Sequence, residues 1–322
     1  MKVFLSNQGN LRNFQAFAKN LDLSGPMKLE IETHEKWITA HPANLAVVAA
    51  LALKVGRENA EIIGEVPESG RYLDRMGLYD FVATESPFRY HKKEPAGRFV
   101  PITVIKNNKE QSRFISDVVP LMHLSEKNTR IIKYILGELI RNVLEHSFAE
   151  NGAVVVAQYY RKTNRVSIAI CDTGIGVWRS MNEVWHPRTD LEAIGLALTP
   201  GITGTTRTEG GTAENAGAGL FYVKSIAKIT RNYFVIYSGK AEYTLLKSRS
   251  DVKSSPTLYA DPFRDRHNAS DKMPDFPGTL VSVDITMNET KEFTELLDLI
   301  GEVYDSAIRE RKRSKYREPN FL

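Results

Sequence analysis

The hydrophobic and polar positions of the chain predict alternating strands and helices over the first hundred or so residues. Alternation of apolar and polar side chains is typical of half-buried strands, and longer apolar runs indicate helices. Strands are predicted at 2–5, 27–33 and 60–66, and helices at 42–55 and 69–76. Pro42 suits the first turn of the longer helix, Gly56 ends it, and Ser69 is the candidate cap of the shorter one. This order predicts a small α/β domain over residues 1–110.

From residue 109 the pattern becomes helical and then alternates between strands and helices over residues 111–322. The segment before it, 86–112, reads as loops with one apolar strand at 99–105, and 248–277 reads as a long loop. Helices are predicted at 109–122, 125–147, 189–198, 218–229 and 290–315. Strands are predicted at 153–160, 165–171, 233–238, 242–247 and 279–286. The second region is therefore expected to be a larger α/β domain.

Composition and charge narrow the class of protein. The chain has 322 residues, of which 42% are hydrophobic and 25% charged, as in ordinary globular proteins. A net charge of +4 does not by itself indicate nucleic-acid binding. Cys171 is the single cysteine, so no intrachain disulfide can form, and the longest apolar run, 45–53, is too short for a membrane span. A cytoplasmic protein without membrane contact is expected.

A polar stripe lies along the predicted helix 125–147. Glu138, Asn142 and His146 are spaced by four residues beside a broad apolar arc. The amide oxygen of Asn142 is a suitable ligand for Mg²⁺, and Glu138 is a candidate base that orients or deprotonates a water or hydroxyl. The alternative is a solvated helix edge.

A carboxylate followed by two glycines ends the strand 165–171, in the sequence Asp172-Thr-Gly174-Ile-Gly176. Asp172 can accept a hydrogen bond from the exocyclic amine of a purine, and the glycines allow the backbone to approach closely. The alternative is an ordinary tight turn.

Two further glycine motifs occur later in the chain. Gly217-Ala-Gly219-Leu220 precedes an apolar helix, whose first backbone N–H groups suit a phosphate, although a glycine-rich linker has the same composition. Gly278-Thr279 opens the strand 279–286, where the Thr279 hydroxyl can support Asp172. The chain has no Walker-type P-loop and no strand followed by the Rossmann fingerprint.

Taken together, these four motifs resemble those of the GHKL ATPases, which include gyrase, MutL, histidine kinases and anti-sigma-factor serine kinases. The resemblance covers about residues 110–290 and implies an α/β sandwich that has a mixed sheet with helices on one face. It implies Mg²⁺ chelation by Asn142, adenine recognition by Asp172, phosphate binding by the amides of Gly217 and Gly219, and a lid over 178–216. Glu138 occupies the place of the base. The residues expected to bind Mg-ATP are Asn142, Asp172, Gly174, Gly176, Gly217, Gly219, Leu220 and Thr279.

The first region resembles STAS-like domains through the helix 42–55, the strand 60–66 and the segment 71–77. The stretch Thr39 to Asn44 departs from the usual phosphorylation loop of that family. A protein partner that binds through this domain is expected, and a homodimer is an open alternative.

The expected function is an ATP-binding regulator with slow Mg-dependent hydrolysis or serine/threonine phosphorylation, coupled to lid closure. No phosphoacceptor histidine motif is present, which disfavours a sensor kinase. One alternative is a non-catalytic, nucleotide-sensing interaction module. Another is a DNA-associated ATPase, for which the basic segment 309–317 is the only support; a helix end rich in cations explains that segment as well.

Overall fold

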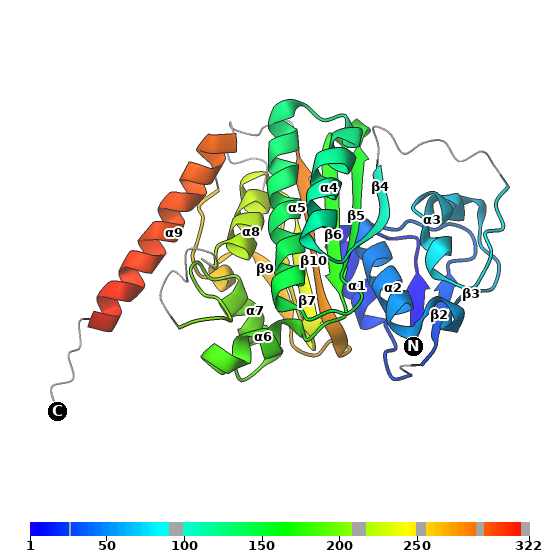
Figure 1. The fold of residues 1–322 in the computed structure, drawn as a ribbon, viewed down its shortest axis with the longest axis horizontal. Helices are drawn as coiled ribbons and strands as arrows, with labels where there is room; N and C mark the ends of the chain where they lie inside the picture. Colours follow the sequence, from blue (N-terminus) through cyan, green and yellow to red (C-terminus); the bar gives the residue numbers. More distant parts are fainter. Residues whose placement is uncertain (26, 90–98, 208–216, 249–255, 288–292, 317–322) are drawn as a thin grey trace.

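The computed structural model describes residues 1–25, 27–89, 99–207, 217–248, 256–287 and 293–316. These residues form an α/β structure with a three-stranded and a seven-stranded sheet. In Figure 1 the N-terminal elements, in blue, lie on one side of the large sheet, and the last helix, α9 (Phe293–Tyr316), lies on the other. None of the described helices is long and apolar enough to cross a membrane.

The small sheet consists of three parallel strands in sequence order, which are β1 (Lys2–Leu5), β2 (Leu29–Thr33) and β3 (Ala60–Ile63). Helix α1 (Phe14–Lys19) follows β1, and helix α2 (Pro42–Val55) follows β2. The structure therefore has a strand in each of the three predicted places, and the longer helix begins and ends at the residues that the sequence indicates. The resemblance to STAS-like domains stays a prediction.

The large sheet is antiparallel at every described strand pair, so the expectation of a mixed sheet is wrong for these strands. Short turns join β5 to β6 and β7 to β8, and such hairpin connections give antiparallel pairs. The strand order is β4-β5-β6-β10-β7-β8-β9. The bounds are β4 (Phe99–Ile105), β5 (Ala153–Tyr160), β6 (Arg165–Asp172), β7 (Phe234–Gly239), β8 (Ala241–Leu245), β9 (His267–Ser270) and β10 (Phe276–Thr286).

Both faces of the large sheet are covered, which corrects the expectation of helices on one face only. Helices α5 (Glu126–His146) and α8 (Gly219–Ile229) pack on one face, and α2 packs on the other against β5, β6 and β10. Along β5, Val154 and Val156 belong to the core on the α2 side, whereas Val155 and Ala157 belong to the core on the α5 side. The N-terminal region therefore shares a hydrophobic core with the large sheet.

Helix α2 is held at the large sheet by a buried polar contact. The His41 side chain caps α2, since its Nδ1 accepts from the backbone N–H of Ala43 (3.1 Å). Its Nε2 lies 3.0 Å from Oδ1 of Asp284 on β10, and the Ser167 hydroxyl donates to the same oxygen at 2.5 Å. Because Nδ1 is an acceptor, Nε2 carries the proton and donates to Asp284. His41 and Asp284 are almost completely buried.

Several local predictions need correction. The predicted helix 109–122 is α4 (Asn108–Arg113) followed by a π-helical and a 3-10 segment. Ser69 does not cap a helix; its hydroxyl accepts from the backbone N–H of Ile38. The predicted loop 248–277 contains β9, although its residues 249–255 lie outside the described part of the chain. Strand β4 precedes residue 110 but pairs with β5 in the large sheet.

The expected lid and the C-terminal helix lie next to each other. The described part of the lid forms α6 (Gly176–Trp185) and α7 (Asp190–Ala197), and residues 208–216 lie outside the description. Helix α9 packs on α5 and α8, and the Arg311 guanidinium donates to the carbonyl oxygen of Pro200, just after α7. Arg309, Lys312 and Arg313 of the basic segment are exposed.

Candidate functional site

A cavity of about 330 Å³ lies between α5, the ends of β6 and β10, the lid and the start of α8. This volume is within the range of about 300–1,000 Å³ that is usual for small-molecule sites. It is lined by eight of the nine residues that the sequence indicates, which are Glu138, Asn142, Asp172, Gly176, Gly217, Gly219, Leu220 and Thr279. The ninth, Gly174, lies in the turn directly behind Asp172.

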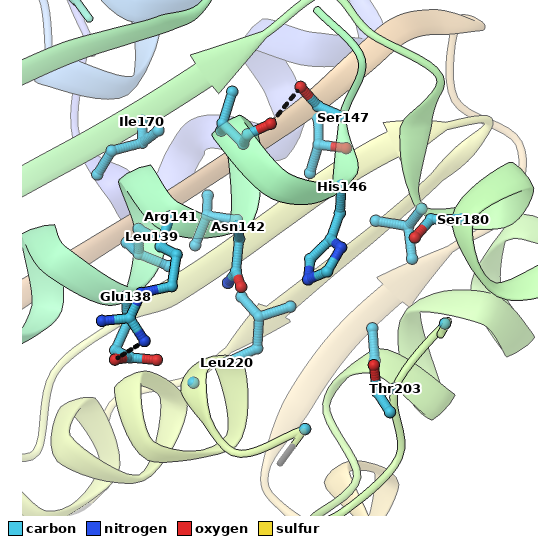
Figure 2. A pocket seen from close by; sticks show the side chains of 18 of the residues that line it. Glu138, Leu139, Arg141, Asn142, His146, Ser147, Ile170, Ser180, Thr203 and Leu220 are labelled. Carbon is cyan, nitrogen blue, oxygen red and sulfur yellow. Dashed lines mark hydrogen bonds and ion pairs between the residues drawn. The ribbon is translucent and has the colours of Figure 1, made fainter. Parts of the chain in front are cut away.

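The polar stripe of α5 faces this cavity. Asn142 and His146 project from the helix toward the side of the cavity that Leu220 and Thr203 line (Figure 2). Ser125 caps α5 at its start, as predicted, and the apolar arc is buried against the sheet. From the sequence, His146 is either a pocket residue or a histidine that only ends the helix. In the structure it lies in the cavity wall.

Glu138 is a largely buried carboxylate at the other end of the stripe. Its side chain is 19% exposed, and Oε1 lies 3.2 Å from NH1 of Arg141 (Figure 2). Burial raises the pKa of Glu138, and the Arg141 guanidinium opposes this rise. A Cβ atom added to Gly219 would lie 2.7 Å from Oε2 of Glu138. The carboxylate therefore lies directly beside the beginning of α8.

Asp172 forms part of the cavity wall at the end of β6. It is 3% exposed, and its carboxylate accepts from the backbone N–H groups of Gly174 (2.8 Å to Oδ1) and Thr279. Burial raises the pKa of Asp172 to about 6, and the two hydrogen bonds only partly oppose this rise. A nearly buried carboxylate without a cationic partner is costly to the fold. Such a cost is typical of a group that is kept for binding.

Glycines let three backbone segments meet around Asp172. Gly278 has φ +142°, and a Cβ there would lie 2.1 Å from the carbonyl oxygen of Asp172. A Cβ at Gly174 would lie 2.0 Å from the carbonyl oxygen of Ser147, at the end of α5. The Ser238 hydroxyl links these segments, since it donates to Gly278 (2.7 Å) and accepts from the N–H of Val177 (2.9 Å). No motif in the sequence indicates Ser238.

The start of α8 forms the opposite wall of the cavity. Gly217 has φ +65°, a conformation that favours glycine, and its carbonyl oxygen accepts from the N–H of Gly201. Helix α8 begins at Gly219, so the N–H groups of its first turn lack intrahelical acceptors. Ala218, Gly219 and Leu220 all line the cavity. This wall can therefore bind an anion with backbone groups.

The other end of α8 is anchored by a buried charge cluster. The ammonium groups of Lys224 and Lys228 both donate to the carboxylate of Asp265, the former at 2.5 Å. Lys224 is 1% and Asp265 4% exposed. Burial lowers the pKa of Lys224, while Asp265 opposes this shift. Helix α8 is thereby fixed to the segment before β9.

The indole N–H groups of the two lid tryptophans form hydrogen bonds to other residues of the lid. The indole N–H of Trp178 donates to the carbonyl oxygen of Pro187 (3.0 Å), and that of Trp185 donates to Thr203 (2.8 Å). Ser180, Met181, Thr203 and other residues that the sequence did not single out therefore come to line the cavity. The spacing of residues in the sequence does not indicate these lining residues, because their positions depend on how the lid folds over the cavity.

The donor set fits a nucleotide with a bound cation. Among the described residues no three His, Cys, Asp or Glu side chains form a metal cluster. A Mg²⁺ ion at the Asn142 amide would therefore take its other ligands from phosphate and water, as Mg²⁺ commonly does.

No known protein-family model matches this chain, and no curated protein matches it.

Proposed function

We propose that the chain is an ATP-binding regulatory protein of the GHKL type. The observation that carries the proposal is the convergence of four separate segments on one cavity. A polar helix edge, a buried carboxylate beside glycines, a glycine-rich helix start and the Gly278-Thr279 strand end all line it or support it. Each segment alone has an ordinary structural explanation, and it is their meeting at one cavity that supports a nucleotide site.

The roles follow from the chemistry of each group. Asp172 accepts a hydrogen bond from the exocyclic amine of adenine, because it lines the cavity and its pKa of about 6 leaves it ionised at neutral pH. The amides at the start of α8 bind phosphate oxygens. The side-chain amide oxygen of Asn142 would bind Mg²⁺, and the bound ion would neutralise part of the phosphate charge.

Glu138 is the proposed base. Its raised pKa brings it closer to neutrality, where general-base catalysis is most efficient, and it lies beside the helix start that would bind phosphates. Arg141 keeps the carboxylate oriented and favours its ionised form. The acceptor of the phosphoryl group is either water or a serine or threonine of a partner protein.

The partner is proposed to bind through the N-terminal region. Helix α2 already packs on the large sheet, so a partner protein would contact the outer surface of the N-terminal region. Trp37, which is 60% exposed in the segment between β2 and α2, is the side chain most suited to it.

The experiment measures Mg-ATP binding by calorimetry and phosphate release for the full chain and for Glu138→Gln. Binding should persist in the variant, while phosphate release should fall by about 10²–10⁴, the usual contribution of a general base. Glu126→Gln is the matched control, since Glu126 lies exposed at the start of the same helix and does not line the cavity.

Failure of the wild-type chain to bind ATP at millimolar Mg²⁺ would refute the proposal. Binding with equal phosphate release in both proteins would instead identify a nucleotide-sensing module without catalysis.

A further inference from the structure

A second cavity, of about 210 Å³, lies at the carboxyl end of β1. In parallel α/β sheets this edge is where ligands bind. The cavity is formed by the loop Ser6 to Asn10, by α1 and by the segment before α2. It shares no lining residue with the ATP cavity, and its existence does not depend on the function proposed above.

The lining of this cavity is polar and uncharged. Among the described residues that line it, none is Asp, Glu, Lys, Arg or His. The carboxamide side chains that line it are Asn7, Gln8, Asn10, Asn13, Asn20 and Asn44. A primary amide offers a donor and an acceptor side by side, so this lining recognises a ligand whose edge alternates donors and acceptors.

Asn44 forms the buried end of the cavity. It is 4% exposed, and its Oδ1 accepts from the backbone N–H of His41 at 3.1 Å. No hydrogen bond of its Nδ2 group to another described residue is present. An N–H₂ group that lines a cavity without a protein partner is a donor available to a ligand.

The loop that forms the cavity is fixed by close backbone packing. A Cβ atom at Gly9 would lie 1.9 Å from the carbonyl oxygen of Thr39, so only glycine allows this approach. The Asn10 side chain accepts from the N–H of Asn13 (3.1 Å), and Ser6 accepts from the N–H of Gln8 (3.2 Å). The polar groups of the loop are therefore held in place before any ligand arrives.

We propose that this cavity binds the base of an uncharged nucleoside. Carboxamides pair with base edges, as Asn and Gln do with adenine, and each flat base face requires apolar or aromatic contact. Phe4, 38% exposed, and Phe17 supply aromatic surface in the cavity lining, and Ala16 supplies apolar surface. The Nδ2 group of Asn44 donates to a ring nitrogen or carbonyl of the base.

The same lining argues for a free nucleoside and against a nucleic-acid strand. Strand binding relies on cations that follow the phosphates, and in the described part of the chain no cationic side chain lines this cavity. A nucleoside without phosphate avoids that requirement.

The experiment titrates the full chain with adenosine, guanosine, cytidine and uridine by calorimetry. One of them is expected to bind with a dissociation constant below about 1 mM. Ala16→Trp, which fills the rim of the cavity, should weaken that binding at least about tenfold, as loss of most of the site volume requires. Thr39→Trp fills the cavity from another element, in case the first variant fails to fold. Lys19→Trp, on α1 outside the lining, is the control and should bind as the wild type does.

Adenosine has a second potential site in the ATP cavity, which the variants separate. Binding retained in Asp172→Asn and lost in Ala16→Trp assigns the nucleoside to the N-terminal cavity. The proposal is overturned if none of the four nucleosides binds, or if the cavity-filling variants bind as the wild type does. Tighter, salt-dependent binding of a pentanucleotide overturns it as well, and so does binding of glucose with no nucleoside binding.

Discussion

Replacing Asp172 by asparagine should change how the stability of the protein depends on pH. The folded-state pKa of Asp172 is raised to about 6 from an ordinary value of 3.8, because the carboxylate is buried. An acid with a raised folded-state pKa binds its proton more tightly in the folded state, so its ionisation destabilises the fold as pH rises from about 4 toward 7. The shift corresponds to about 3 kcal/mol, fully developed above about pH 7.

Asp172→Asn removes this ionisation, so the difference between variant and wild type carries the effect of this one group. The free energy of unfolding of both proteins is measured with urea at pH 5, 6, 7 and 8. About half of the cost is already present at pH 5, so the difference should move in favour of the variant by about 1.4 kcal/mol between pH 5 and 8. ATP affinity should fall at every pH, since a neutral amide accepts less strongly from an exocyclic amine.

A difference that stays constant within about 0.5 kcal/mol, the usual precision of such comparisons, would refute this reasoning about Asp172. Asp284→Asn is the matched control on the adjacent strand. His41, Arg165 and Ser167 hold the pKa of Asp284 below its usual value against the effect of burial, so Asp284 is ionised in both states above pH 5. The control should therefore lose about 3 kcal/mol at pH 8, because it leaves His41 and Arg165 without their carboxylate partner.

Two further predictions concern the supports of the proposed ATP cavity. Gly278→Ala should destabilise the fold by more than about 2 kcal/mol and abolish ATP binding, because its Cβ would collide with the Asp172 carbonyl oxygen; wild-type-like urea unfolding would contradict this. Asp265→Asn should cost about 3–5 kcal/mol, since it leaves the ammonium groups of Lys224 and Lys228 buried without a counter-charge. A loss below about 1 kcal/mol on thermal or urea unfolding would show that the cluster does not hold α8.

A continuous apolar run in the sequence indicates a strand and also that both faces of this strand are buried. The segment Ala153 to Ala157 is hydrophobic at every position, which indicates a strand that is buried on both faces. The structure covers one face with α5 and the other with α2. The expectation of helices on one face came from the resemblance of the ATP-site motifs, which describe the site and not the opposite side of the sheet.

Other features had no local signal. Strand β9 lies in a polar stretch, and its hydrogen bonds to β8 define it as a strand more than its composition does. Ser238 supports the site from β7, and Ser180 and Thr203 line it from the lid. The position of the Asn44 amide in the second cavity has no signal in the sequence either, because the loop after β1 forms that cavity.

The sequence by itself determined the helices and strands with strong periodicity and the residues of the four motifs on which the ATP proposal is based. Both depend on spacing along one element, such as the four-residue steps from Glu138 to His146. The tertiary structure alone decided that the motifs share one cavity, that α2 closes the second face of the sheet, and that Asp172 and Asp284 differ in pKa. These properties depend on which segments exclude water from one another, and contacts between residues far apart in the chain leave no periodic trace in the sequence.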